Sequence, residues 1–231
     1  MLGSTGFVGR VVGDALERAG FDVTRHSRTT GSAPTKIDLT SERASDKVRA
    51  IALGCELCVS CVGAIGFDDA RVEEANGEAN ARAAEGCRQA NVKKFAYVSV
   101  SSEVRDVASK ASMMKGYFEG KTRAEEAIRA NFASDDAFVV KPSFIYGGSS
   151  FSLNPPRVTK AYGEVLSKVL GSTVVKGVAK SAPGVVKVVL AEPASVDDVA
   201  MAIVGFALGK RGGGTCDGTD EIKASAALAR E

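Results

Sequence analysis

A tyrosine and a lysine four positions apart are the residues of this chain best placed for acid–base chemistry. Tyr117 and Lys121 lie in GYFEGKTRAEEAI, whose pattern predicts a helix. Residues with this spacing share one helix face. A free tyrosine has a pKa of about 10 and needs a cationic neighbour to exchange protons near neutral pH. The pair predicts a proton-transfer site. The same spacing also arises by chance, and the tyrosine would then only pack at the helix surface.

Three serines on the preceding predicted strand carry hydroxyls that could hydrogen-bond to an oxygen beside this pair. They are Ser99, Ser101 and Ser102, in KKFAYVSVSS. Strand alternation places Ser99 and Ser101 on one face and Ser102 on the other. Spacing leaves all three open, and we favour Ser101.

The chain begins with a glycine-rich turn, MLGSTGFVGRVVG, which carries G-x-x-G-x-x-G. Glycines let the backbone turn sharply and approach a pyrophosphate closely, and the following helix points its amides and positive dipole end at the phosphates. The residues expected to bind phosphate are Gly3, Ser4, Thr5, Gly6, Phe7, Val8 and Gly9. Alternatively, the glycines serve only the close packing of helix on strand.

Predicted strands and helices alternate along the chain as in βαβ units. The expected strands are 21–28, 56–63, 93–102 and 137–147, and the expected helices are 8–20, 41–54, 68–91, 112–132 and 194–210. This alternation predicts an α/β fold with a doubly wound parallel sheet and right-handed crossovers.

The chain divides into three expected segments. Residues 1–150 form the core, and the proline-punctuated residues 151–193, with a helix-like piece at 159–170, form a small substrate lobe over the strand ends. Residues 194–231 return to the core, with a glycine-rich turn region at 211–222 before a last short helix.

The glycine turn lacks a preceding strand, because only Met1 and Leu2 come before Gly3. A sheet without its central strand would leave this turn unanchored. We therefore expect that the natural N-terminus lies upstream, with roughly five Val- and Ile-rich residues running into Leu2 at the centre of the sheet.

Composition excludes several classes of function. The net charge is +2, from 30 basic and 28 acidic residues, without a basic run that would indicate nucleic-acid binding. No stretch reaches the roughly 18 apolar residues needed to cross a bilayer. Five cysteines and a single histidine, His26, lack the paired spacing of a zinc site, so we predict no metal and no disulfides, as in a reducing compartment.

Five motifs in the same order resemble the short-chain dehydrogenase/reductase superfamily, in its extended and atypical branches. They are GSTGFVG, the Asn76–Gly77 helix with its serine-bearing strand, GYFEGKTRAEEAI, KPSFIYGG and ASVDDVAMAI. The resemblance spans about residues 3–209 and departs from the family pattern at Lys141 and Ser143, which replace an arginine and a glycine. The resemblance is strongest to plant and algal plastid proteins with an NAD(P)-binding Rossmann fold. It is more distant for the nucleotide-binding accessory subunit of mitochondrial complex I and for a coenzyme Q biosynthesis factor.

The resemblance implies roles for individual residues. Tyr117 would give or take the proton at the substrate oxygen, Lys121 would lower the tyrosine pKa and hold the nicotinamide ribose, and the strand serine would orient the substrate. The further residues implied in cofactor binding are Arg28, Asp38, Cys61, Val62, Gly63 and Pro142.

The end of the predicted strand over residues 21–28 favours NADPH over NADH as the cofactor. VTRHSRTT holds Arg25 and Arg28 and no acid, and an arginine there pairs with the 2′-phosphate. Arg28 fits that position, or it is a solvated loop arginine. Asp38 would meet the adenine amino group, or it is a helix cap.

Two hypotheses of function follow. The first is an NADP(H)-dependent oxidoreductase with an apolar substrate, such as a quinone or isoprenoid, between the sheet edge and residues 151–193. The second is a non-catalytic nucleotide-binding accessory subunit in peripheral contact with an organellar membrane complex. By resemblance alone, the chloroplast is favoured over the mitochondrion as its location.

Overall fold

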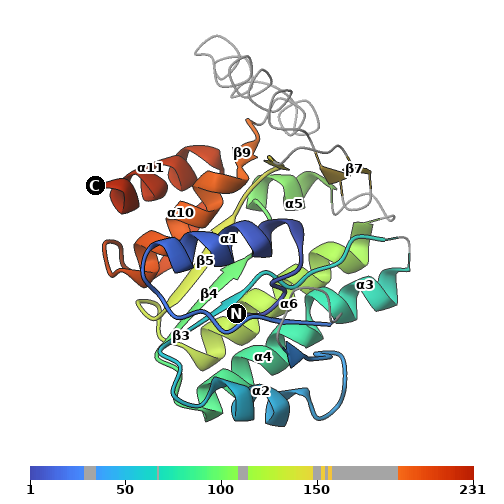
Figure 1. Ribbon diagram of the computed structural model, residues 1–231. Coiled ribbons are helices and arrows are strands. Elements are labelled where there is room, and N and C mark those ends of the chain that lie inside the picture. Colours follow the sequence, from blue (N-terminus) through green and yellow to red (C-terminus); the bar gives the residue numbers. More distant parts are fainter. Residues whose placement is uncertain (29–34, 67, 109–113, 148–151, 154–155, 158–191) are drawn as a thin grey trace.

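The computed structural model describes residues 1–28, 35–66, 68–108, 114–147, 152–153, 156–157 and 192–231. These residues form a parallel sheet with helices on both faces (Figure 1). The strands of this sheet are β1 (His26–Ser27), β2 (Thr35–Lys36), β3 (Leu57–Ser60), β4 (Lys94–Val98), β5 (Ala137–Lys141) and β10 (Gly214–Asp217). Four of them lie in the order β10-β5-β4-β3, and β1 pairs with β2, all in parallel. The predicted doubly wound parallel fold is confirmed.

Leu2 joins these two groups of strands. It forms parallel bridges to His26 on one side and to Ser60 on the other. Its amide donates to the carbonyl of Val59 at 2.8 Å, and its carbonyl accepts from the amide of Cys61 at 3.0 Å. Leu2 is thus at the centre of the sheet, directly before the glycine turn.

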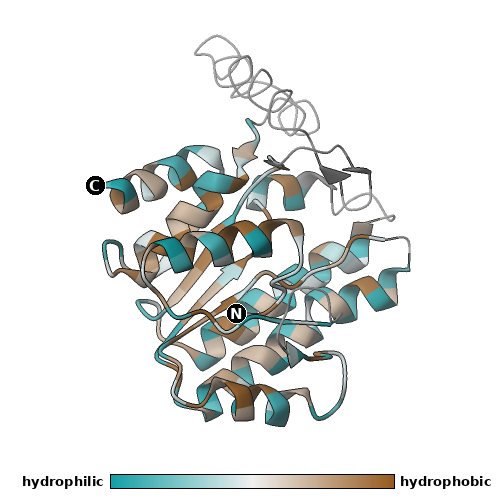
Figure 2. Ribbon diagram, viewed as in Figure 1, coloured by the Kyte–Doolittle hydropathy of each residue, from teal (hydrophilic) through white to brown (hydrophobic). Residues whose placement is uncertain are grey.

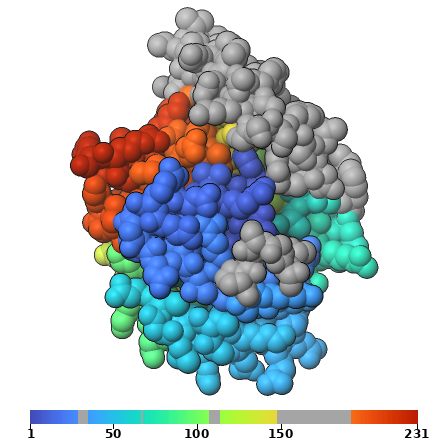
Figure 3. Space-filling view, viewed as in Figure 1, coloured from blue at the N-terminus to red at the C-terminus, as the bar shows by residue number. Residues whose placement is uncertain are grey.

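Two layers of helices cover the sheet. The helices are α1 (Phe7–Arg18), α2 (Ala44–Ala52), α3 (Asp69–Asn76), α4 (Glu78–Gln89), α5 (Ser102–Ala108), α6 (Lys115–Asn131), α10 (Val196–Ala207) and α11 (Thr219–Arg230). One layer holds α1, α10 and α11, and the other holds α2, α4 and α6 (Figure 1). Apolar residues gather on the strands and on the helix sides that face them (Figure 2). In the space-filling view, α1 lies between α10–α11 and the α2 region (Figure 3).

The strand expected over residues 21–28 is shorter than predicted. Only His26–Ser27 pair, as β1. On the side of the glycine turn the pairing partner is residues 1–2, which reach back only to the carbonyl of Thr24. Residues 21–23 therefore pair with no strand among the described residues.

The single helix expected over residues 68–91 is two helices, α3 and α4, which meet at Gly77. A Cβ at Gly77 would lie 3.0 Å from the Glu73 carbonyl oxygen and from the Gly120 Cα. The glycine thus permits close contact with α6, and the break redirects the helix axis where helical periodicity alone predicts continuity.

Two further elements differ from the prediction. The region 211–222, expected to be a turn, contains β10, which pairs with β5 over four residues. The segment after Ser101, expected to continue the strand to Ser102, begins helix α5.

The small lobe is only partly described. β6 (Ile145–Tyr146) pairs in parallel with β9 (Ala194–Ser195), and β7 (Ser152–Leu153) pairs antiparallel with β8 (Pro156–Arg157). Residues 158–191, with the helix expected at 159–170, lie outside the described residues. The boundaries 1–150, 151–193 and 194–231 remain predictions.

We predict that Gly86→Ala destabilises the protein by about 1–3 kcal/mol, as overpacking does. A Cβ at Gly86, in α4, would lie 2.5 Å from the Ser45 carbonyl oxygen and 2.7 Å from the Val48 Cβ. The matched control is Gly205→Ala in α10, where the nearest atom lies at an ordinary 3.4 Å. This control should be neutral or gain up to about 1 kcal/mol of helix propensity. Urea unfolding measures both, and equal effects would contradict the close packing of α4 on α2.

Candidate dinucleotide site

The glycine turn packs against the loop that follows β3. Gly3 has φ +74°, and a Cβ there would lie 2.9 Å from the carbonyl carbon of Cys61. A Cβ at Gly9 would lie 2.1 Å from the Gly3 carbonyl oxygen. Only glycine fits these positions. The backbone of the turn, the first turn of α1 and the β3 loop are therefore in direct contact.

The N-terminus of α1 has no side-chain cap. Gly6 is the N-cap residue, and no acidic side chain occupies the first turn. Thr5, Phe7 and Val8 are half-buried around it. Such a helix end offers backbone amides and a partial positive charge to an anion.

Ser4 fixes the turn from inside. Its side chain is buried, and both its amide and its hydroxyl donate to the carbonyl of His26 at 3.1 Å. Among the predicted phosphate-binding residues, Ser4 therefore holds the turn on β1 with its own donors.

Asn80 holds the start of the loop over residues 61–64. The Ser60 hydroxyl donates to its Oδ1 at 2.6 Å, and its Nδ2 donates to the carbonyl of Val62 at 3.2 Å. Asn80 is fully buried. Sequence reasoning missed it, although a polar residue four positions after Asn76 in an alanine-rich helix is a detectable signal.

Asn76 holds the end of the same loop. Its Oδ1 accepts from the amide of Ala64 at 3.3 Å, and its Nδ2 donates to the carbonyls of Ala64 and Val72 at 2.7 and 2.8 Å. Asn76 thus supports this loop through hydrogen bonds to its backbone. The two buried amides place Cys61, Val62 and Gly63 against the glycine turn.

The ammonium of Lys121 reaches this loop from α6. It donates to the carbonyl of Val98, at the end of β4, at 2.9 Å. A Cβ at Gly63 would lie 3.2 Å from its Nζ and 2.8 Å from Asn76 Oδ1. Burial lowers the pKa of Lys121 from 10.5 to about 8, opposed by the Cys61 thiol and the Glu125 carboxylate.

Tyr117 lies on the same face of α6, and its ring centroid is 5.8 Å from the Lys121 Nζ. Its ring packs with Val100, Val104 and Phe118, and meets Phe118 edge-on at 5.1 Å. Burial raises the pKa of Tyr117 to about 12. The predicted pair is together in space, but within the described residues no hydrogen bond joins the Tyr117 hydroxyl to a strand serine.

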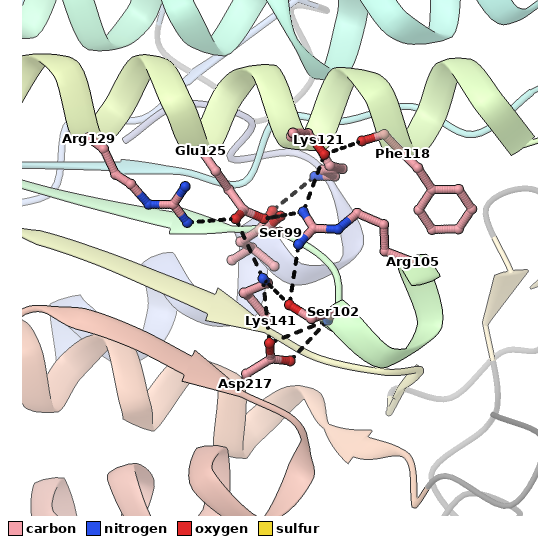
Figure 4. Close-up of polar contacts among 11 residues, drawn as sticks. Ser99, Ser102, Arg105, Phe118, Lys121, Glu125, Arg129, Lys141 and Asp217 are labelled. Atoms are coloured by element: carbon pink, nitrogen blue, oxygen red, sulfur yellow. Dashed lines mark hydrogen bonds and ion pairs between the residues drawn. The ribbon is translucent and has the colours of Figure 1, made fainter. Parts of the chain in front are cut away.

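Ser99 belongs to a buried charge cluster instead (Figure 4). Its hydroxyl donates to Glu125 at 2.6 Å. The Glu125 carboxylate is 2% exposed and also pairs with Arg105 at 3.3 Å, Arg129 at 3.0 Å and Lys141 at 3.5 Å. Glu125 lies one helical turn after Lys121, so the cluster and the lysine are on adjacent turns of α6.

Ser102 is engaged by the same cluster. Its amide donates to Asp217 at 3.1 Å, and its hydroxyl accepts from Lys141 at 2.5 Å. The amide of Ser101 donates to the carbonyl of the buried Pro142 at 2.9 Å. With the hydroxyls of Ser99 and Ser102 occupied, Ser101 remains the preferred candidate, and it is 4% exposed.

The two arginines that flank β1 have different environments. Arg25 pairs with Asp14 at 2.6 Å and with Glu17 at 2.8 Å, both on α1. Its charge is therefore neutralised within the protein. Arg28 is exposed. Asp38 accepts from the amide and hydroxyl of Thr40, which lower its pKa, so its carboxylate caps a turn before α2.

This arrangement fits a dinucleotide. Gly3, Gly9 and Gly63 let the turn, α1 and the β3 loop approach closely, the α1 N-terminus is uncapped by side chains, and a lysine lies at the far end of the loop. A family model described as NAD(P)H-binding matches residues 3–152. This chain belongs to the NAD(P)H-binding family.

Similarity to known proteins agrees with that membership. An uncharacterised chloroplastic protein of Arabidopsis thaliana is 27% identical over 213 residues, which are 88% of this chain and 69% of the relative. A short-chain dehydrogenase/reductase superfamily protein from Agrobacterium tumefaciens with bound NAD superposes with a TM-score of 0.59 at 15% identity, covering 94% and 76% of the two chains. A dTDP-4-dehydrorhamnose reductase from Bacillus anthracis in complex with NADP superposes with a TM-score of 0.61 at 13% sequence identity, covering 99% of this chain and 79% of the reductase. This NAD(P)H-binding protein thus has the Rossmann fold of short-chain dehydrogenase/reductase-like proteins.

In the described parts of this NAD(P)H-binding protein, none of the helices is long and apolar enough to span a membrane. The same residues contain no group of three or more His, Cys, Asp or Glu side chains arranged to hold a metal ion.

We predict that burial of Lys121 makes stability depend on pH. The folded-state pKa of about 8 lies below the ordinary 10.5, so the unfolded chain binds more protons between these values. Stability therefore rises as the pH increases from 8 to 10.5. The free energy of unfolding in urea, measured against Lys121→Met, should show this rise in the natural protein only. Parallel pH profiles for the two proteins would contradict the buried position.

Proposed function

We propose that this protein is an NADP(H)-dependent oxidoreductase. The observation that carries the proposal is the position of the Lys121 ammonium, between the Gly63 loop and the Tyr117 ring. A bound nicotinamide supplies a hydride donor or acceptor. Lys121 holds the ribose, Tyr117 exchanges a proton with the substrate oxygen, and Ser101 orients that oxygen.

Arg28 gives the preference for NADPH. It is the exposed arginine at the end of β1, whereas Arg25 is held by two carboxylates of α1. A 2′-phosphate beside Arg28 would gain a charge-assisted contact. The role of Arg25 in this preference, expected from the sequence, is withdrawn because its charge is already paired.

The substrate is apolar, of the quinone or isoprenoid class. Tyr117 stands beside Val100, Val104 and Phe118. Ile65 and Phe144, on the loops after β3 and β5, are 37% and 50% exposed. An apolar substrate would cover such side chains on binding. The plastid is the location we propose, on the basis of the chloroplastic relative.

One observation favours a second function, that of a nucleotide-binding accessory subunit in peripheral contact with an organellar membrane complex. Burial raises the pKa of Tyr117 to about 12 and the ring packs among apolar side chains. A hydroxyl in that state exchanges protons poorly at neutral pH. Such a protein would bind the dinucleotide without turning a substrate over.

Replacing Arg28 by Ala should weaken NADPH binding by about 1.5–3 kcal/mol, the contribution of a charge-assisted hydrogen bond, and leave NADH binding unchanged. Calorimetric titration of both cofactors measures this. Arg25→Ala is the matched control and should affect both cofactors alike, since its partners Asp14 and Glu17 are on α1. Equal losses for both cofactors in Arg28→Ala would reject the assignment.

Replacing Tyr117 by Phe should lower the turnover of apolar quinones or carbonyl compounds by about 100-fold or more, with NADPH affinity intact, because only a hydroxyl is lost. Lys121→Ala should weaken both binding and turnover. Tyr97→Phe is the control, since its buried hydroxyl has no hydrogen-bond partner within the described structure. Full turnover in Tyr117→Phe would refute the catalytic role, and NADPH binding without turnover of any compound would favour the accessory subunit.

A further inference from the structure

Two buried cysteines face each other between β3 and α4. Cys58 is 7% exposed and Cys87 is fully buried, and both belong to the apolar cluster between the sheet and the layer of α2, α4 and α6. Their side chains form a hydrogen bond. All five cysteines of the chain are free thiols in this structure. The thiols of Cys58 and Cys87 are thus in direct contact and unbridged.

The spacing of residues on the two elements brings these cysteines together. Cys58 and Ser60 are alternate residues of β3, so their side chains share one face of the sheet. Asn80 and Cys87 are separated by about two turns of α4, so they share one helix face. The Ser60 hydroxyl bonds Asn80 at 2.6 Å. Because α4 lies between two parallel strands, β3 and β4, it runs back against them, and the residue before Ser60 on this face meets the next part of the helix.

The chain that leaves α4 holds the same end of the helix against β3. The Cys87 carbonyl accepts from the Val92 amide at 3.0 Å. The amides of the next two residues then donate to the Glu56 carbonyl, at 3.1 and 3.0 Å, directly before β3 begins. Hydrogen bonds near the start of α4 and just after its end therefore hold the two thiols in register.

We propose that Cys58 and Cys87 are a dithiol that a peroxide oxidises to a disulfide between β3 and α4. The hydrogen bond from the Cys87 thiol lowers the pKa of Cys58, against the opposing effect of burial. The same bond, together with burial, raises the pKa of Cys87. A thiolate attacks a peroxide, whereas a thiol does not. Cys58 is therefore the sulfur that reacts first, and Cys87 is the sulfur that resolves the product.

The oxidation has two steps. The Cys58 thiolate attacks one oxygen of hydrogen peroxide, so that an S–O bond forms, the O–O bond breaks, and the hydroxide that leaves takes the proton of Cys58 to become water. The Cys87 sulfur then attacks the sulfenic sulfur of Cys58, so that the S–S bond forms and the S–O bond breaks. The second hydroxide leaves as water with the proton of Cys87. The two thiols are oxidised by two electrons in total, and one peroxide is reduced to two molecules of water.

The test is to treat the folded protein with hydrogen peroxide and then to alkylate the remaining thiols after unfolding. The reduced protein offers all five thiols. We expect the oxidised chain to lose the mass of two hydrogen atoms, to carry two alkyl groups fewer, and to release a peptide pair joined through Cys58 and Cys87. Dithiothreitol should restore every thiol by exchange.

Four variants separate this pair from the other thiols. Cys58→Ala and Cys87→Ala should each abolish the disulfide. Cys216→Ala is the matched control, a buried thiol on the opposite face of the sheet, and should leave the disulfide unchanged. Cys55→Ala should also leave it unchanged, because Cys55 is exposed. Circular dichroism before and after peroxide shows that each chain is folded, and the peptide map of the unsubstituted chain decides the question if a variant does not fold.

Four results would overturn the proposal. They are an unchanged mass after peroxide, oxidation of single cysteines to sulfinic acid without a link, a disulfide through a different cysteine or between two chains, and a disulfide that forms only in urea.

Discussion

Pairing of one residue on both of its sides is the constraint on which this structure depends. Leu2 forms a parallel bridge to His26, the first residue of β1, and another to Ser60, the last residue of β3. It thus holds β1–β2 in register with the four strands β3, β4, β5 and β10. Gly3 follows directly, with the positive φ that turns the chain toward α1. The bonds that set the register of the sheet therefore also set the distance between the glycine turn and the loop at Cys61.

The far end of the site depends on buried amides. Asn76 and Asn80 bond the carbonyl of Val62 and both backbone groups of Ala64, and so hold that loop beside the turn. The Lys121 ammonium then meets a fixed surface, tied to the Val98 carbonyl. Its low pKa follows from this enclosure. The candidate site combines a hydrogen-bonded backbone loop with a buried lysine whose charge is costly to maintain.

Local patterns predicted most of the fold, because α1, β3, β4, β5 and α6 each have clear periodicity. The predictions that were wrong concern features that depend on contacts between segments distant in the sequence. The break at Gly77 serves packing on Gly120, which helical periodicity does not reveal. The same holds in the site. The sequence spacing alone places Tyr117 and Lys121 on one helix face. The ion pairs of Arg25 with α1, however, depend on how the segment before β1 lies against that helix.

The cluster around Glu125 constrains how this sequence can diverge. One nearly inaccessible carboxylate faces the cations of Arg105, Arg129 and Lys141, and Lys141 also pairs with Asp217 at 3.4 Å. Loss of Glu125 alone would leave the buried Lys141 ammonium with Asp217 as its ion-pair partner, whereas joint replacement of a buried pair by apolar residues is often neutral. Positions 125 and 141 are therefore epistatic, and relatives that change one should change the other. The covariation of these two positions would record a contact between α6 and β5 in sequences alone.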